Sequence, residues 1–454
     1  MNFERHIITE LEAWKINNEL RKPLLLRGAR QVGKTTLVNE FAKSYTHSIH
    51  LNLERKDDAK YFHNFNDAKT IVNALFAVNS IPSSQLKNTL LFIDEIQESP
   101  EAIALLRYFY EDVPELHVIA AGSLLEHVMR KVKSFPVGRV QYLYVHPLNF
   151  SEFLNAKQKT GALEQLQKVP VPDFAHQLLL KQFHEYAIIG GMPEVVKTYL
   201  STNSLSDLSK IYEGIWASYK DDVEKYAENT TSSRVIKHIM NTAHLFVDQR
   251  IKFQNFGNSN YKSREVSEAM RSLNDARIIQ LIYPTTAISP PIIPDLKKSP
   301  RLQFLDTGLI NHELAIQVDM LALEDLNTTY KGAIIPHLVT QEIMSLSTHK
   351  YKQTNFWVRE KVQSSAEVDI VLQYEDKLIP VEIKSGSEGK LKSLHQFIEK
   401  VDHPYAIRLY AGPFKIEEHS TPTLGKPYYL MNLPYYLVTK LHDYIAYLVK
   451  SYPQ

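Results

Sequence analysis

The octapeptide from Gly28 to Thr35 constrains this chain more than any other stretch. Its residues fit the GxxxxGK[ST] pattern at every fixed position: Gly28, Ala29, Arg30, Gln31, Val32, Gly33, Lys34 and Thr35. The apolar run at 23–27 predicts a buried parallel strand before it, and residues 36–43 predict a helix after it. A tight loop in that setting turns backbone N–H groups inward, and the helix adds its positive end. The pattern therefore predicts a nucleoside triphosphate site, with Lys34 at the β- and γ-phosphates and Thr35 on Mg²⁺.

Composition excludes several other kinds of site. The chain has 454 residues, too many for one core, so two to four domains are expected. It has no cysteine, which excludes disulfides, cysteine-ligated zinc, iron–sulfur clusters and thiol nucleophiles. Its 18 histidines show no metal-ligand spacing, so no zinc is expected.

Charge and hydropathy bear on location and partners. No apolar run approaches the length that spans a bilayer, and the first residues lack an apolar signal core, so we expect a cytoplasmic protein without a membrane partner. The 52 basic and 51 acidic side chains give a net charge of +1. Proteins that bind many phosphates usually carry an excess of basic residues. This chain has almost none, so contact with nucleic acid would depend on local basic sites.

Two adjacent carboxylates follow an apolar run downstream of the loop. Residues 47–53 predict a second strand, and Leu90–Glu95 predict a third that ends in Asp94 and Glu95. In a Walker B strand, Asp94 would hold the Mg²⁺ shell through water and Glu95 would accept a proton from the attacking water. Two solvated acids at a strand end are the alternative, but the upstream phosphate loop favours catalysis.

Ser123 and Arg139 complete the candidate catalytic set. Residues 118–123 predict a fourth strand, and Ser123 at its end could sense the γ-phosphate through a hydrogen bond. Arg139 precedes a predicted fifth strand at 140–145. It is a candidate sensor in its own subunit or a finger that reaches a neighbour's nucleotide. An ordinary surface salt bridge is an equally weighted alternative.

These motifs and others along the chain resemble a family of prokaryotic AAA-type ATPases with a C-terminal restriction-endonuclease-like domain. The matching stretches are residues 27–35, 92–97, 138–139, 146–153, 190–194, 221–223, 304–309, 332–333, 367–369 and 382–386. The resemblance implies ATP hydrolysis by an α/β P-loop NTPase core of the AAA/ASCE type with a parallel sheet. It also implies a helical lid, a winged-helix middle and a C-terminal α/β nuclease-like domain.

We expect five segments on this basis. They are an ATPase core at 1–150, a helical lid at 151–230, a winged-helix-like domain at 231–290, a linker leading into the C-terminal domain at 291–330, and the restriction-endonuclease-like domain at 331–454. Residues 284–300 hold five prolines and are expected to lack regular structure. The candidate DNA contacts of the winged helix are Lys262, Arg264, Arg271 and Arg277. A protein-binding or purely structural winged helix is the alternative.

A β-hairpin carries the nuclease-like residues. Runs at 366–373 and 377–384 flank turn residues, and folding symmetrically about Glu375 and Asp376 would pair Asp369 with Glu382. The same register pairs Glu367 with Lys384 and places all four polar side chains on one face.

This face resembles that of the PD-(D/E)xK nucleases. Asp369 and Glu382 would chelate Mg²⁺, and Lys384 would orient the attacking water. A half-buried hairpin with a salt-bridged face is the alternative. The chain departs from the family pattern at one position. The family has an acid four residues after the glycine of its Gly-Ala pair, and this chain has Pro336 at that position. Glu342 also matches a family acid, but it lies on another side of the helix.

Three functions are consistent with these motifs. The first is a Mg²⁺-dependent ATPase whose nucleotide state repositions the winged-helix and nuclease-like domains on DNA. The second is an ATP-driven regulatory switch whose nuclease-like domain is inactive and recognises a partner. The third is a DNA-binding ATPase without cleavage. ATP and Mg²⁺ are the expected cofactors, and DNA and a second copy of the chain are the candidate partners.

Overall fold

The chain divides into two units. The computed structural model describes residues 3–17, 21–65, 67–123, 125, 136–223, 227, 229–321, 326, 332–349, 354–359, 366–384 and 391–453. The first unit is Met1–Pro147 with Asp275–Ile278 and Ser347–Tyr351, and the second is Leu148–Asn274, Ile279–Leu346 and Lys352–Gln454. In the described part of the chain, no helix is both long enough and apolar enough to cross a bilayer.

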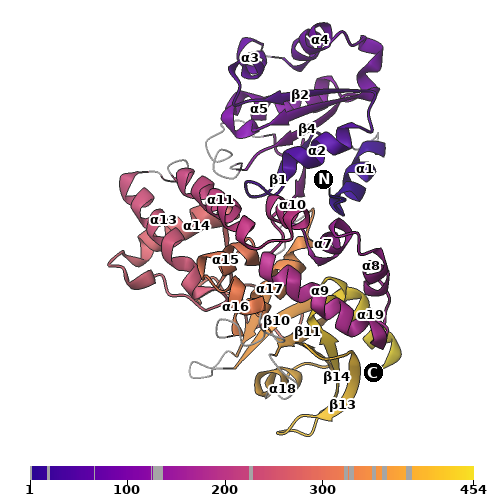
Figure 1. Ribbon diagram of the computed structural model, residues 1–454, viewed down its shortest axis with the longest axis vertical. Helices are drawn as coiled ribbons and strands as arrows, with labels where there is room; N and C mark the ends of the chain where they lie inside the picture. Colours follow the sequence, from indigo (N-terminus) through magenta and orange to yellow (C-terminus); the bar gives the residue numbers. More distant parts are fainter. Residues whose placement is uncertain are drawn as a thin grey trace. The chain divides into compact units, whose positions relative to one another are not determined.

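A parallel five-stranded sheet with the order β2-β3-β4-β1-β5 forms the centre of the first unit (Figure 1). Its strands are β1 (Leu24–Arg27), β2 (His47–Asn52), β3 (Thr89–Asp94), β4 (His117–Ala121) and β5 (Gln141–Tyr144). All positions of β3 and β4 are buried, as expected for inner strands covered on both faces. The predicted parallel sheet is confirmed, and β4 lies between the strands that end in the phosphate loop and in Asp94.

Helices cover this sheet. They are α1 (Ile7–Ile16), α2 (Lys34–Ala42), α3 (Lys56–Asn64), α4 (Ala68–Val78) and α5 (Pro100–Asp112), with the short 3₁₀ helices η1 (Ser83–Asn88) and η2 (Ile96–Glu98). Side chains of α3, α4 and α5 share one apolar cluster with alternate strand residues such as Leu25 and Ile93. Helix α2 instead contacts β3 and β4 outside that cluster and holds the end of the loop against the sheet.

The second unit begins with helices, in agreement with the helical periodicity of its sequence. They are α7 (Phe150–Ala156), α8 (Thr160–Leu166), η3 (Asp173–Ala175), α9 (His176–Ile189), α10 (Pro193–Thr202), η4 (Ser206–Leu208) and α11 (Ser209–Asp221). Gly190 and Gly191 separate α9 from α10. A Cβ on Gly191 would lie 2.0 Å from the carbonyl oxygen of Leu148, so only glycine fits this close backbone approach.

Two further helices and a two-stranded antiparallel sheet follow. The elements are α13 (Thr230–Thr242), η5 (Ala243–Phe246), η6 (Phe256–Asn258), α14 (Ser263–Asp275), β6 (Ile279–Ile282) and β8 (Arg301–Phe304). The predicted helix and strand at 262–282 are therefore present, and β6 pairs with β8.

The segment at 291–330, expected as a linker leading into the C-terminal domain, contains β8, α15 (Thr307–Glu313) and α16 (Gln317–Leu321). The expectation that residues 284–300 lack regular structure was wrong. Residues 284–300 include a short strand, β7 (Pro284–Thr285), which pairs with β9 (Asn355–Val358). β7 lies at the edge of its sheet, and an edge strand tolerates the missing N–H of a proline.

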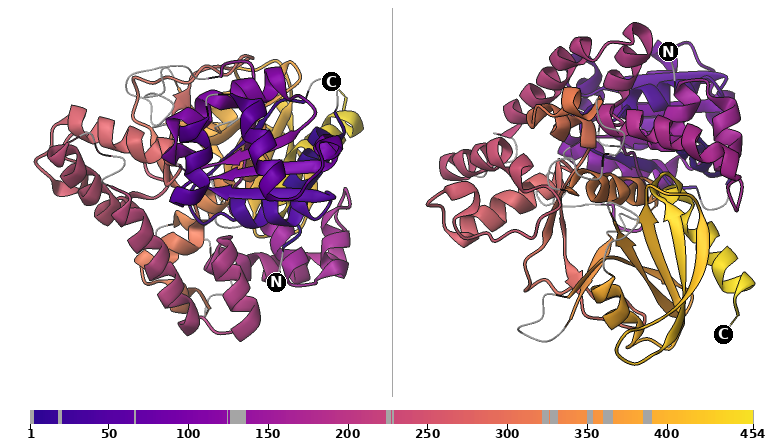
Figure 2. Two further views of the ribbon diagram at one scale, coloured as in Figure 1. Left: turned by 90° about the horizontal axis from the view of Figure 1, so that it is seen from above. Right: turned by 60° about the horizontal axis from the view of Figure 1, so that its bottom comes forward.

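A seven-stranded mixed sheet with the order β13-β14-β12-β11-β10-β9-β7 dominates the C-terminal part. The right view of Figure 2 shows its orange and yellow strands side by side. The remaining elements are α17 (Ile334–Ser345), β10 (Glu367–Tyr374), β11 (Lys377–Ile383), α18 (Lys392–Ile398), β12 (Tyr405–Tyr410), β13 (Lys415–Ser420), β14 (Pro427–Pro434), η8 (Tyr435–Lys440) and α19 (Leu441–Ser451). Helix α18 packs on this sheet through Leu394, Phe397 and Ile398.

The predicted hairpin register is confirmed over residues 370–374 and 377–381. β10 and β11 are antiparallel, with Ile370 opposite Val381 and Tyr374 opposite Lys377. Glu375, the first turn residue, adopts a positive φ of 51°. Such a two-residue turn fixes the register of both strands. Extending the register by one residue places Asp369 opposite Glu382.

Candidate functional site

The phosphate-binding loop connects β1 to α2, as the sequence predicts. Gln31 and Gly33 have positive φ values of 63° and 92°. Gly28 packs so tightly that a Cβ would lie 2.3 Å from the carbonyl oxygen of Val145. Of the other loop residues, Ala29 and Val32 are buried, and the guanidinium of Arg30 lies 3.6 Å from a carboxylate oxygen of Glu54.

Lys34 begins α2 with its ammonium directed at the loop. Its Nζ donates to the carbonyl oxygens of Gly28 at 2.9 Å and Ala29 at 2.8 Å, and the side chain is buried. An ammonium held inside a ring of backbone groups at a helix N-terminus is suited to bind phosphate oxygens.

Thr35 and Asp94 meet at the end of this loop. The hydroxyl of Thr35 donates to Asp94 Oδ2 at 2.7 Å, although the two residues come from different elements. Burial raises the pKa of Asp94, but hydrogen bonds from His50, Thr35 and the Glu95 amide outweigh burial and hold it below its ordinary value. Asp94 is therefore ionised at neutral pH. A hydroxyl and a carboxylate are hard oxygen donors of the kind that Mg²⁺ prefers, so the pair fits this ion.

Glu95 lies directly beyond the end of β3 in a left-handed conformation, with φ 51° and ψ 43°. Its Oε2 accepts a hydrogen bond from Gln97 Nε2 at 2.5 Å. Gln97 is buried, and its Oε1 has no hydrogen-bond partner among the described residues. This oxygen would lie 2.3 Å from a Cβ on Gly122, so the glycine makes room for it.

Ser123 lies two residues after the end of β4, at the edge of the sheet that also carries the loop and Asp94. The register aligns Ala121 with Leu26 of β1, and Ala120 with Ile93 of β3. The hydroxyl of Ser123 is buried and has no hydrogen-bond partner in the described part of the chain. An unpartnered buried hydroxyl at this edge is suited to bond a phosphate oxygen.

Sequence reasoning missed two residues here, Gln97 and His50. The imidazole of His50 stacks on Phe92 with ring centroids 4.6 Å apart, and its Nε2 lies 3.6 Å from Asp94 Oδ2. Gln97 belongs to one of the stretches that carried the family resemblance, so a signal for it existed. Nothing in the sequence of β2 marks His50.

Arg139 lies away from the loop of its own subunit. It precedes β5, whose Gln141 aligns with Leu24 at the amino end of β1, whereas the loop follows the carboxyl end. Its Nε donates to Glu111 Oε1 at 3.1 Å, and both side chains are partly exposed. The surface salt bridge is therefore present, and this position does not support a sensor within the same subunit.

The acidic face of the β10–β11 hairpin holds an arginine that the sequence did not predict there. Arg301 Nε donates to Glu367 Oε1 at 2.8 Å, and Arg301 Nη2 donates to Asp369 Oδ1 at 3.1 Å. The second oxygen of Asp369 accepts from the amide of Ile383 at 2.8 Å. Both oxygens of Asp369 are thus engaged by protein donors.

Glu382 and Lys384 pair with each other. Lys384 Nζ lies 2.6 Å from Glu382 Oε1. Burial raises the pKa of Glu382, the charge of Asp369 adds to this effect, and Lys384 opposes it. No three Asp, Glu or His side chains of the described residues are arranged to hold a metal ion. The predicted divalent site on this face does not fit the residues as they stand.

Helix α17 carries Pro336 and Glu342, the two positions that bear on the acid expected from the family pattern. Pro336 lies in its first turn and supplies no acid. Glu342 is fully buried and accepts from Tyr186 Oη at 2.7 Å and from the Phe150 amide at 3.0 Å. Burial raises the pKa of Glu342 to about 8. Its two oxygens are therefore used in packing helices, which explains why Glu342 does not replace the missing ligand.

Two of the four predicted DNA-contacting residues have side-chain contacts within the protein. Arg264 Nε donates to Glu268 Oε1 at 2.8 Å within α14. The guanidinium of Arg277 lies 5.6 Å from the ring centroid of Tyr144, both in the first unit. Lys262 directly precedes α14, and Arg271 lies within it.

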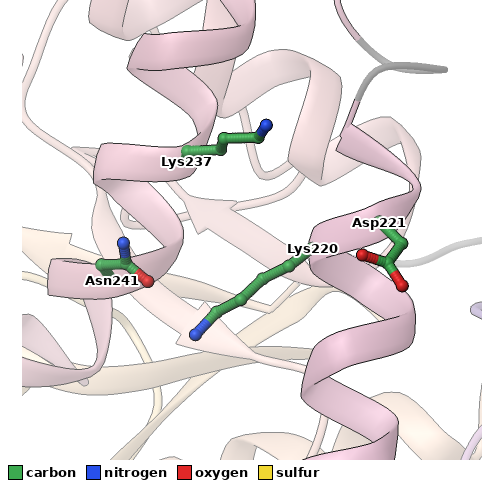
Figure 3. A pocket seen from close by; sticks show the side chains of 4 residues that line it. All are labelled: Lys220, Asp221, Lys237 and Asn241. Carbon is green, nitrogen blue, oxygen red and sulfur yellow. The ribbon is translucent and has the colours of Figure 1, made fainter.

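A polar cavity of about 400 Å³ lies between α11 and α13 in the second unit. Figure 3 shows the side chains that line it, Lys220 and Asp221 from α11 and Lys237 and Asn241 from α13.

Comparisons with known proteins assign one domain. A family model described as an AAA domain matches residues 20–154. Models described as domains of unknown function, DUF8612 and DUF4143, match residues 180–319 and 331–425. The chain is 22% identical over 423 residues to the uncharacterized protein MJ1637 of Methanocaldococcus jannaschii, covering 87% of this chain and 82% of that protein.

Solved structures are also similar to parts of the chain. The Walker-type ATPase PABY2304 of Pyrococcus abyssi is 15% identical with a TM-score of 0.44, over 69% of this chain and 96% of that one. AMPPCP-bound DnaA from Aquifex aeolicus is 13% identical with a TM-score of 0.26, over 59% and 86%. The domain match and the loop geometry together identify residues 20–154 as an AAA-type ATP-binding domain.

Proposed function

We propose that the first unit hydrolyses ATP in a Mg²⁺-dependent reaction. The observation that carries this proposal is the 2.7 Å contact between Thr35 and Asp94, which joins the phosphate loop to the strand end that bears Glu95. A loop that only bound phosphate would not require a carboxylate pair at that place.

Each of the groups at this site would have a separate role in the reaction. The ammonium of Lys34 and the loop amides would hold the β- and γ-phosphates, and Ser123 would donate to a γ-phosphate oxygen. Glu95 would accept the proton of the attacking water. Thr35 and Asp94 would hold Mg²⁺, which when bound neutralises phosphate charge. Gln97 would set the direction of the Glu95 carboxylate through its hydrogen bond.

Phosphate release from ATP tests this proposal directly. We expect the purified full chain to hydrolyse ATP with Mg²⁺ and to stop when EDTA removes the ion, because Thr35 and Asp94 then lack the cation that they would share with the phosphates. A chain that takes up no nucleotide at millimolar Mg²⁺ and ATP would contradict the assignment. Arg139 as a finger in a neighbouring subunit stays a prediction, and such a finger would require an oligomer.

For the second unit we propose the regulatory alternative, in which a nuclease-like domain recognises a partner without cutting it. The specific support is the pairing of Asp369 with Arg301, together with Pro336 at the expected acid position. ATP turnover would then act as a timer for partner release. DNA is one candidate partner, through the exposed face of α14.

A nicking assay separates this alternative from a nuclease. We expect no nicking of supercoiled DNA by the full chain with Mg²⁺ or Mn²⁺, because both oxygens of Asp369 are engaged. Nicking that Asp369→Ala abolishes, while ATP hydrolysis survives, would establish the nuclease instead. Salt-dependent DNA binding without nicking would select a DNA-binding ATPase.

A further inference from the structure

A second pocket in the second unit, of about 410 Å³, is lined by the loop that follows β7, the edge strand of the seven-stranded sheet. The amide of Asp295 donates to the carbonyl oxygen of Pro284 at 2.7 Å, and this bond holds the two ends of the loop together. Ala287 and Ile292 of the loop pack against the apolar cluster that contains Trp357. The loop is therefore folded against this side chain, and the pocket is a built part of the fold.

Most of the residues that line this pocket are apolar, and one is positively charged. Ile288 and Ile293 line it from the loop and are 39% and 68% exposed. Lys400, two residues after the end of α18, also lines it, and its ammonium lies 5.9 Å from the ring centroid of Trp357. No acidic side chain is among the described residues that line the pocket. The pocket thus combines apolar walls with an excess of positive charge.

The indole N–H of Trp357 gives a second, independent indication of a ligand. Trp357 belongs to β9, lines the pocket and is 1% exposed. Its ring packs edge-on against Phe397 with centroids 5.3 Å apart, but its Nε1 has no hydrogen-bond partner among the described residues. Buried N–H groups normally have an acceptor, because an unpaired one costs its desolvation. A ligand with an acceptor oxygen would supply the missing partner.

We propose that this pocket binds a small organic acid, whose carboxylate accepts from the Lys400 ammonium and from the Trp357 indole. Its apolar body would lie against Ile288 and Ile293. An ammonium and an indole are donors only, so both require an acceptor. Two hydrogen bonds of about 2.9 Å span roughly the separation of the ammonium and the ring, so one carboxylate can bind both. The volume lies within the range of about 300–1,000 Å³ that small-molecule sites have. The proposal does not rest on ATP hydrolysis.

A fluorine NMR titration of nucleotide-free full-length protein with para-trifluoromethylphenylacetate tests this proposal. We expect a Kd on the order of 1 mM, as for an ordinary ligand of this size. The corresponding amide has the same shape without the charge, and it should bind about tenfold more weakly. Acetate lacks the apolar body and should not displace the probe at equal concentration.

Lys400→Met and Trp357→Phe should each weaken binding of this acid by about tenfold, because each removes one donor to a charged group. Methionine keeps most of the apolar stem of the lysine, and phenylalanine keeps a ring beside Phe397. Lys392→Met is the matched control. Lys392 begins α18, is exposed and does not line the pocket, so its replacement should leave the affinity unchanged.

Equal affinities of the wild-type protein for the acid and the amide would overturn the proposal, as would an unchanged affinity in Lys400→Met. If Trp357→Phe does not fold, Ile293→Asp takes its place, because Ile293 is exposed and a carboxylate in the pocket wall should repel the acid. Unchanged affinity in that folded variant would also contradict the site. Binding of a capped peptide with one glutamate and one phenylalanine, without binding of the free acid, would show that the pocket receives a protein segment instead.

Discussion

Glu95→Gln is expected to leave ATP bound and to lower its turnover by about 10²–10⁴-fold, the usual contribution of a positioned general base. The amide that replaces the carboxylate keeps the size of the side chain and can still bond Gln97, but it cannot accept the water's proton. The lysine, the threonine and the loop amides that would contact the phosphates are unchanged. Binding of a labelled ATP analogue and steady-state phosphate release measure the two effects separately.

Glu98→Gln is the control for this variant. Glu98 lies three residues farther along in η2 and is exposed, so the same chemical change there should leave the rate unaltered. If Glu95→Gln hydrolysed ATP at the full rate, Glu95 would not be the base.

Lys34→Ala should weaken ATP binding by about 10- to 100-fold, because hydrogen bonds to charged groups contribute about 1.5–3 kcal/mol and 1.4 kcal/mol is tenfold in affinity. The buried Nζ has its position fixed by two loop carbonyls, so it would exchange these bonds for phosphate oxygens without moving far. Titration calorimetry with Mg²⁺ and a non-hydrolysable analogue measures this change.

Lys43→Ala provides the comparison for Lys34→Ala. Lys43 follows the other end of α2, where its exposed ammonium pairs with Glu40. Its removal should leave the affinity as it was. Equal affinities for the wild-type protein and Lys34→Ala would contradict the role of Lys34 in the phosphate site.

The parts that were predictable from sequence are those encoded locally. The loop from Gly28 to Thr35 carries its own turn geometry, and the short apolar run before Asp94 is typical of an inner strand. The hairpin register followed from a two-residue turn, because the period of two then fixes every opposed pair.

The parts that were not predictable depend on distant contacts. Arg301 lies 66 residues from Glu367 in sequence, and no periodic pattern links the two. Arg139 precedes a strand, but only the parallel register shows that this end of the strand is the one away from the loop. The short elements β8, α15 and α16 were missed because proline-rich sequence precedes them, and tertiary pairing overrides such local signals.

The first unit is not one continuous piece of chain. The amide of Tyr144, on the edge strand β5, donates to the carbonyl oxygen of Thr348 at 2.7 Å, and Nε2 of His146 lies 3.1 Å from the carbonyl oxygen of Ser347. A fragment that stops at Pro147 would lose these partners and expose a bare strand, which invites aggregation. We therefore expect a fragment cut at Pro147 to be less stable than the same unit within the whole polypeptide.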